Sequence, residues 1–96
     1  MKKLSPDEIA SAIAALPAWA VLQDKLHREY RFGDFIHAFG FMATAAIAIE
    51  KMNHHPEWAN VYNRVTVDLS THDVGGITEK DIQLAHTLET LAKKLS

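Results

Sequence analysis

The chain contains no cysteine, and its 96 residues include only 3 prolines and 4 glycines. The absence of thiols excludes a disulfide framework and a thiolate zinc site. Gly75-Gly76 lacks the lysine and the glycine spacing of a phosphate-binding loop, and no H-E-x-x-H motif is present. Adjacent histidines in an extended segment point to opposite sides, so His54 and His55 rarely bind one ion together. We therefore predict no metal site.

The chain also has no strong excess of charge and no long apolar run. Its formal net charge is −2 and its 10 Lys and Arg residues are scattered, so we expect no basic face for direct nucleic-acid binding. Asp7 and Glu8 interrupt the N-terminal segment where a signal peptide would be apolar. The most apolar stretch, 35–49, is shorter than a bilayer-spanning helix. We expect a cytoplasmic protein without a membrane partner.

The composition fits one small domain that spans residues 1–96. Hydrophobic residues make up 48% of the chain, which is enough for a real core, and no repeat, linker or low-complexity tract divides it. A domain of this size often extends its core by self-association. An oligomer is therefore expected.

Local patterns in the first half predict a helix followed by two strands. Ser5 and Glu8 form a capping-box pattern at the start of the helix, and Pro17 ends it. Residues 19–22 and 26–32 indicate a hairpin around a polar turn at 23–25, with one apolar face and one wet face.

The second half predicts a helix, two strands and a last helix. Asp34 is the expected N-cap of the longest helix, which runs to about Met52 and is apolar on almost every side. Such a helix should be covered on both sides, by the sheet and by something else such as a partner subunit. Residues 61–69 indicate either a hairpin with a turn near Asn63-Arg64 or one bent strand. Residues 74–76 indicate a flexible loop, and 78–81 a second capping box.

Residues suited to acid–base chemistry are concentrated between Glu50 and Asp81. His54 and His55 follow the long helix directly, where exposed carbonyl groups favour a protonated, proton-donating imidazole. Glu50 is either held there to orient a histidine four residues on, or is an exposed surface residue. Taken singly, Trp58 is more often a packing residue than a ligand-stacking one, and Asp81 is explained by helix capping.

At these spacings, Glu50, His54-His55-Pro56, Tyr62, His72 and Asp81 together resemble the pattern of the pterin-4a-carbinolamine dehydratases. The similarity extends over essentially the whole chain. The resemblance implies an α+β fold, with a four-stranded antiparallel sheet, three helices packed on one of its faces, and the order α-β-β-α-β-β-α.

The resemblance also implies an enzyme, a hydro-lyase that dehydrates a 4a-hydroxytetrahydropterin to the quinonoid dihydropterin without a metal or a bound cofactor. In the family this activity regenerates the pterin used by aromatic amino acid hydroxylases, which implies a hydroxylase client. Members assemble as homodimers or homotetramers. Some animal relatives are dimerisation cofactors of a homeodomain transcription factor, which implies a regulatory protein partner.

The resemblance assigns roles to individual residues. His55 is the leading general acid, His54 is a second acid or proton relay, and His72 helps to bind and deprotonate the pterin. The implied substrate-binding residues, which orient groups, line the pocket or offer backbone hydrogen bonds, are Glu50, Trp58, Ser70, Thr71 and Asp81.

One position departs from the family pattern, and two other interpretations stay open. Members often carry an acid where this chain has Asn53, whose amide forms hydrogen bonds but cannot become charged. The alternatives are a binding module that serves as a partner-docking dimer, and a pterin-binding or assembly protein without turnover. The joint presence of the carboxylates and histidines favours the enzyme, because a docking scaffold has no need to keep them together.

Overall fold

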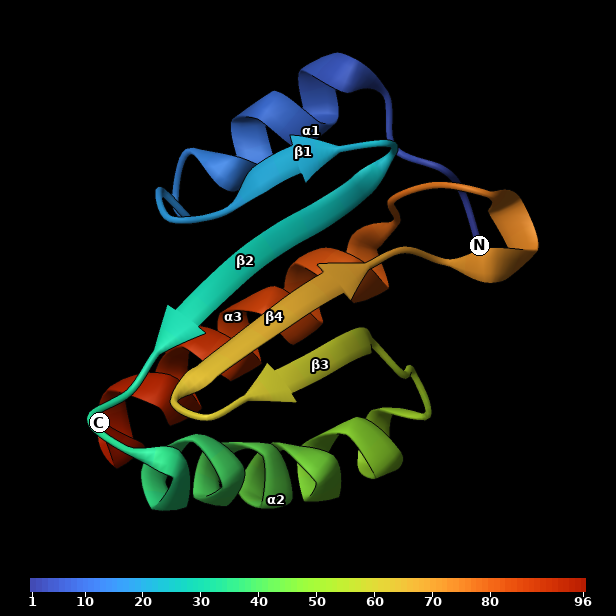
Figure 1. Ribbon diagram of the computed structural model, residues 1–96. Coiled ribbons are helices and arrows are strands. Elements are labelled where there is room, and N and C mark those ends of the chain that lie inside the picture. Colours follow the sequence, from blue (N-terminus) through green and yellow to red (C-terminus); the bar gives the residue numbers. More distant parts are fainter.

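The computed structural model describes all 96 residues as a four-stranded antiparallel sheet with its helices on one side (Figure 1). The helices are α1 (Pro6–Ile13), α2 (Phe35–Met52) and α3 (Glu79–Leu95), with a short 3-10 helix, η1 (His72–Val74). The strands are β1 (Ala20–Leu22), β2 (Lys25–Arg31), β3 (Glu57–Val61) and β4 (Arg64–Leu69). The strand order β1-β2-β4-β3 joins two hairpins through β2 and β4. The predicted fold class and element order are confirmed.

The predicted helix starts are confirmed by their hydrogen bonds. The Ser5 hydroxyl accepts the backbone N–H of Glu8 at 3.1 Å, and the Glu8 carboxylate accepts that of Ser5 at 2.9 Å. The Asp34 carboxylate accepts the backbone N–H of His37 at 2.8 Å and begins α2. The first helix is shorter than predicted, because it ends at Ile13 rather than at Pro17.

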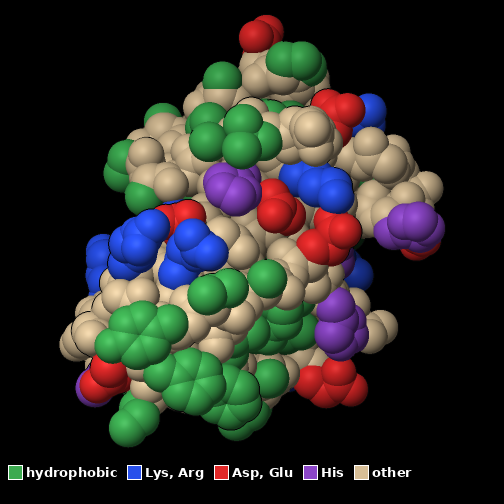
Figure 2. Space-filling model, viewed as in Figure 1, with side chains coloured by type: hydrophobic (Ala, Val, Ile, Leu, Met, Phe, Trp, Pro, Cys, Tyr) green, Lys and Arg blue, Asp and Glu red, His purple; other side chains and the backbone are tan.

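Alternation along the paired strands divides the sheet into an apolar and a polar face. Across β2 and β4, Leu26 pairs with Leu69 and Tyr30 with Val65, and all four side chains are buried beneath the helices. The neighbouring pairs place polar and charged side chains on the other face, which no helix covers (Figure 1). Figure 2 shows charged and histidine side chains across this side of the molecule. We call it the open face.

The long helix α2 is apolar on two opposite sides. One side packs in the core and contains Ala38, Phe41, Ala45 and Ile49. The other side is exposed and carries Phe35, Ile36, Phe39 and Ile47; it forms part of the hydrophobic surface low in Figure 2. The expectation that both sides would be covered is therefore met on only one side within a single chain.

The helix α2 is longer than the apolar stretch 35–49, which was judged too short to span a bilayer. With 18 residues and a mean hydropathy of 1.3, α2 is long and apolar enough to cross a membrane by length and composition. The core helix of a globular domain passes the same test, and α2 has a buried face that packs against α3 and β4.

The two turns on either side of β4 lie close to their predicted places. The β3–β4 turn lies at Tyr62-Asn63, one residue earlier than expected, and it joins two paired strands, as the hairpin alternative predicted. The segment 74–76 lies in a loop closed by backbone hydrogen bonds. Thr71 donates its N–H to the Gly76 carbonyl at 2.7 Å, and Gly75 provides the left-handed backbone that the loop requires.

Glu89 on α3 fastens that helix to β2. Its Oε1 accepts hydrogen bonds from Trp19 Nε1 at 2.8 Å, Arg28 Nε at 2.9 Å and the Tyr30 hydroxyl at 2.9 Å. Burial works to raise the pKa of Glu89, but the hydrogen bonds from Arg28, Tyr30 and Trp19 outweigh it and hold the pKa below its usual value. Burial and the charge of Glu89 raise the pKa of Tyr30, which therefore remains a donor.

We expect Glu89→Gln to lower the free energy of unfolding at pH 7 by about 1–2 kcal/mol, because a charged acceptor of three hydrogen bonds is lost. The pKa of Glu89 is lower in the folded than in the unfolded chain, so its stabilisation is fully present above the ordinary value of 4.5. It is lost as the pH falls through the folded pKa. Urea denaturation should show the gap between wild type and variant closing towards low pH. An unchanged gap would contradict this account; exposed Glu29→Gln is the control.

Candidate active site

The two adjacent histidines that follow α2 point in different directions. Asn53 follows the helix with φ 53° and ψ 44°, a left-handed backbone that asparagine tolerates better than most residues. Beyond it the chain turns towards β3, so that His54 contacts α3 while His55 contacts α2. The amide at position 53 is thus explained by backbone geometry.

His54 is held by a buried carboxylate. Its Nε2 lies 2.5 Å from Asp81 Oδ1, and the side chains are 10% and 0% exposed. Asp81 Oδ2 accepts the Thr71 hydroxyl and the Thr78 backbone N–H, both at 2.9 Å. Because an ionised carboxylate only accepts, the Nε2 of His54 carries the proton and its Nδ1 is left for another partner.

Asp81 therefore orients a histidine in addition to its predicted place in the second capping box. It accepts the Thr78 N–H at the start of α3, and through Thr71 it also ties down the loop that carries His72. The Thr78 hydroxyl lies 2.7 Å from Thr71 Oγ and donates to it, because the Thr71 hydrogen is already given to Asp81. The helix start, the loop and His54 share one acceptor.

His55 pairs with a different and exposed carboxylate. Its Nε2 lies 3.0 Å from Glu50 Oε1, with side chains that are 57% and 80% exposed. The sequence pattern linked Glu50 to the histidine four residues on, His54. The structure pairs it with His55 instead, because the helix ends at Met52 and the i, i+4 geometry does not continue past Asn53.

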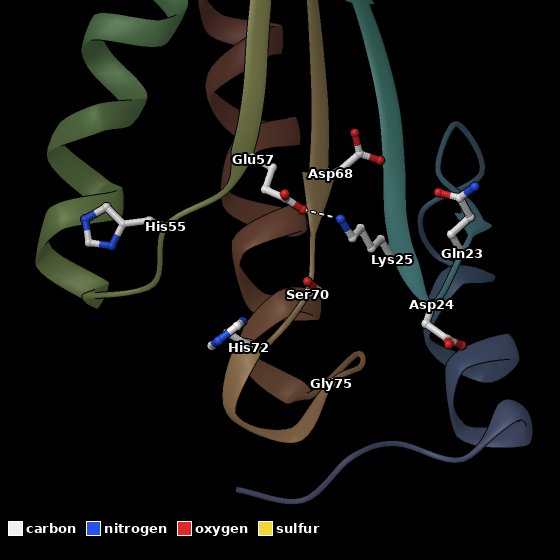
Figure 3. Close-up of a pocket in the computed structure, with 9 residues that line it drawn as sticks. All are labelled: Gln23, Asp24, Lys25, His55, Glu57, Asp68, Ser70, His72 and Gly75. Atoms are coloured by element: carbon white, nitrogen blue, oxygen red, sulfur yellow. Dashed lines mark hydrogen bonds and ion pairs between the residues drawn. The ribbon is translucent and has the colours of Figure 1, made fainter.

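Two adjoining hollows open beside these histidines. The first, which we call the histidine hollow, has a volume of about 360 Å³, and its lining includes Asn53, His54, His55, Ser70, Thr71 and His72. The second, the sheet-end hollow, has a volume of about 440 Å³ and lies at one end of the open face (Figure 3). Its lining is Gln23, Asp24, Lys25, His55, Glu57, Asp68, Ser70, His72 and Gly75.

The two hollows form one concave region, because His55, Ser70 and His72 line both. Both volumes lie in the range of about 300–1,000 Å³ that small-molecule sites occupy. No hydrophobic side chain lines the sheet-end hollow. Small-molecule sites are usually lined mainly by apolar groups, so this region suits a hydrogen-bonding ligand.

The predicted site residues are only partly brought together. His54, His55, Ser70, Thr71 and His72 share the histidine hollow, with Asp81 buried behind His54. The remaining two lie outside both hollows: Glu50 beside His55, and Trp58 packed against the core on the apolar face. The backbone N–H and carbonyl of Thr71 already form hydrogen bonds within the loop. Of the two residues predicted to offer backbone hydrogen bonds to a ligand, Ser70 is therefore the better candidate.

The charged wall of the sheet-end hollow was not predicted from the sequence pattern. Lys25 forms an ion pair with Glu57, and His27 Nδ1 lies 2.9 Å from Asp68 Oδ1. Alternation did predict a wet face on β2. It did not reveal that β2 lies beside β4 and so brings Lys25 near the histidines.

The chain is similar to proteins of one known family. Residues 2–91 match the family model described as pterin 4 alpha carbinolamine dehydratase. A relative in Solibacter usitatus, strain Ellin6076, bears the provisional name pterin-4-alpha-carbinolamine dehydratase. It is 66% identical over 90 residues, which cover 94% of this chain and 95% of the relative. The chain belongs to the pterin-4-alpha-carbinolamine dehydratase family.

Further relatives agree with this dehydratase family. A protein of the same provisional name in Burkholderia pseudomallei, strain 1710b, is 50% identical over 93 residues, which cover 95% of this chain and 92% of the relative. A crystal structure from Brucella melitensis, described as a transcriptional coactivator/pterin dehydratase, has a TM-score of 0.92 and 44% identity. The match covers 95% of this chain and 99% of that one. The family's named activity is the dehydration of a pterin 4a-carbinolamine.

We expect Asp81→Ala to lower the free energy of unfolding by about 2–4 kcal/mol, because it leaves His54, Thr71 and the Thr78 N–H without their buried acceptor. Urea denaturation measures the loss. Asp73→Ala, an exposed carboxylate in η1, is the matched control and should change stability by less than about 0.5 kcal/mol. Equal stabilities of the two variants would show that Asp81 is not the structural centre of the site.

Proposed function

We propose that the protein converts a 4a-hydroxytetrahydropterin to the quinonoid dihydropterin and water by histidine acid–base catalysis. The observation that carries the proposal is the concave region that His54, His55 and His72 line together, two of them paired with carboxylates. In the reaction, the C4a–O bond breaks as the leaving hydroxide takes up a proton, and a proton leaves the pterin nitrogen. No electron is transferred to another molecule.

The contacts of each histidine support a division of roles. His55 lines both hollows and is exposed, so it can reach a hydroxyl group on the bound ring and acts as the leading acid. His54 is almost buried and fixed by Asp81, which suits a second acid or a relay that works through Nδ1. His72, at the start of η1, lines both hollows and takes the proton from the pterin.

The polar lining supports a pterin as the ligand. A pterin ring presents several hydrogen-bond donors and acceptors, and the histidine hollow offers the imidazoles together with the hydroxyl groups of Ser70 and Thr71. The 4a-hydroxy compound is the form in which a pterin leaves an aromatic amino acid hydroxylase. We propose that the reaction belongs to the recycling of that cofactor and takes place in the cytoplasm.

A second feature favours an assembly of several copies. Ile36, Phe39 and Ile47 recur at helical spacing along the exposed side of α2, and Ile36 is 77% exposed and Ile47 73%. An apolar stripe of this kind gains from burial against another chain. We propose that α2 supports a homo-oligomer. The coactivator description of the Brucella melitensis protein makes a further regulatory partner a reasonable proposal for the same fold.

Stopped-flow absorbance of 4a-hydroxytetrahydropterin decay tests the catalytic proposal. The wild type should exceed the uncatalysed rate. Each single variant, His54→Ala or His55→Ala, should lower the catalysed rate by no more than about 10²- to 10⁴-fold, which is the contribution typical of one acid or base. The double variant should approach the uncatalysed rate. His86→Ala, on the exposed side of α3, is the control. A double variant as fast as the wild type would refute the histidine mechanism.

Light scattering after size-exclusion chromatography tests the assembly. The wild type should elute as a dimer or tetramer, and Ile36→Lys/Ile47→Lys should shift it to smaller species, because two charges would be placed in the apolar contact. Val21→Lys, an exposed apolar position on β1, serves as the control. A monomeric wild type would rule the proposal out.

A further inference from the structure

We infer that residues 1–4 form a strap that positions the loop carrying His72, which makes the N-terminal segment part of the active site. The inference rests on the proposed function, in which His72 takes a proton from the pterin. In Figure 1 the segment before α1 lies beside the loop between β4 and α3, and Leu4 is hydrogen-bonded to Ile77 at the end of that loop. Met1 lines the histidine hollow together with His72.

The His72 loop, residues 71–77, has little support of its own. His72, Asp73 and Gly75 are exposed, and the Thr71 carbonyl accepts the Gly75 N–H at 3.0 Å within the loop itself. Short exposed segments with few buried contacts open locally at a low cost in free energy. The loop is fixed at its start, where the Thr71 hydroxyl donates to Asp81. The position of His72 therefore depends also on what holds the other end.

The strap holds that other end. Leu4 donates its backbone N–H to the Ile77 carbonyl at 2.8 Å, and its side chain is partly buried against the core. Ile77 is only 1% exposed, so this hydrogen bond ties the strap to a well-packed part of the molecule. The residue before Leu4, Lys3, lies against Gly76. The strap and the loop are therefore in contact over two consecutive residues of each.

The glycine at position 76 is explained by the close approach of the strap. A Cβ atom added to Gly76 would lie 2.5 Å from Lys3 Cε, 3.0 Å from Cδ and 3.1 Å from Cγ. Carbon atoms are in optimal contact at about 3.5–4.0 Å, so a side chain at this position would displace the Lys3 stem. Gly75 has a positive φ and Gly76 does not, so the backbone conformation does not require a glycine at position 76.

The contact covers the hydrogen bond that closes the loop. The Gly76 carbonyl accepts the Thr71 N–H at 2.7 Å, and Gly76 is buried although Gly75 beside it is exposed. The hydrocarbon stem of a lysine covers such a surface while its ammonium group stays in water. Because the stem keeps water from competing for the closing hydrogen bond, the loop stays closed and His72 keeps its position. A misplacement of about 1 Å at a reacting group can cost roughly 10²-fold in rate.

Two substitutions remove the contact from opposite sides. Gly76→Ala adds a methyl group that displaces the Lys3 stem, and Lys3→Ala removes the stem itself. Neither residue lines either hollow. Each variant should lower kcat for 4a-hydroxytetrahydropterin by about tenfold with a smaller change in KM, because His72 is less well placed while the groups that line the hollow remain.

A double variant and two controls make the test specific. In Lys3→Ala/Gly76→Ala the added methyl group has no stem to displace, so the loss should be no larger than in either single variant. Lys3→Met keeps an unbranched stem of similar length and should stay within about twofold of the wild type. Gly33→Ala, where an added Cβ meets nothing within 4 Å, should leave kcat unchanged.

Hydrogen exchange measures the effect of the strap without turnover. In Gly76→Ala and in Lys3→Ala the Thr71 N–H should exchange about tenfold faster than in the wild type, because the loop opens more often. The N–H of Val67, in the middle of β4, should exchange at an unchanged rate. The urea midpoint should also be unchanged, since the stem of Lys3 covers a loop and not the core.

The outcomes separate the strap from the proposed function. If the wild type shows no turnover, the proposed function fails, and hydrogen exchange decides the strap alone: faster exchange in both variants supports it, and unchanged exchange overturns it. If the wild type turns over and every variant matches it, the strap has no role although the dehydratase stands. Additive losses in the double variant, or a Lys3→Met variant as slow as Lys3→Ala, would overturn the role given to the stem.

Discussion

The site depends on the hydrogen bonds that the buried carboxylate of Asp81 accepts. This carboxylate has no exposed surface and accepts hydrogen bonds from His54, Thr71 and the backbone of Thr78. A carboxylate inside a protein is stable only when its acceptor positions are filled, so the end of α2, the loop before α3 and the start of α3 must meet at this one point. The position of His54 follows directly from that requirement.

The rest of the candidate active site lies around this buried carboxylate and is far more exposed. His55 and its partner Glu50 lie on the surface, and His72 sits on a short loop closed by the pairing of Thr71 with Gly76. One rigid histidine beside two accessible ones suits a reaction in which protons are exchanged with a ligand that enters from solvent. The polar end of the open face extends this region towards β2.

Local sequence rules predicted most of the fold, because they act over a few residues. The capping pattern at Ser5 and the N-cap at Asp34 are present as hydrogen bonds, and alternation on β2 and β4 matches the buried and polar faces. The rules failed where the outcome depends on a distant segment or a single backbone angle. The left-handed Asn53 directed Glu50 to His55 rather than to His54, whereas Trp58 packs against the core, as its residue type taken singly had favoured.

By itself, the sequence determined the element order, the helix starts and the clustering of acid–base residues between Glu50 and Asp81, because each is written in spacing along the chain. Only the tertiary structure decided which carboxylate each histidine contacts and that Lys25 stands beside them. For Lys25 the physical reason is the strand order β1-β2-β4-β3, which brings together residues that are remote in sequence, and for the two histidines it is the turn of the chain at Asn53. Such contacts are fixed by packing over the whole core, and no local pattern encodes them.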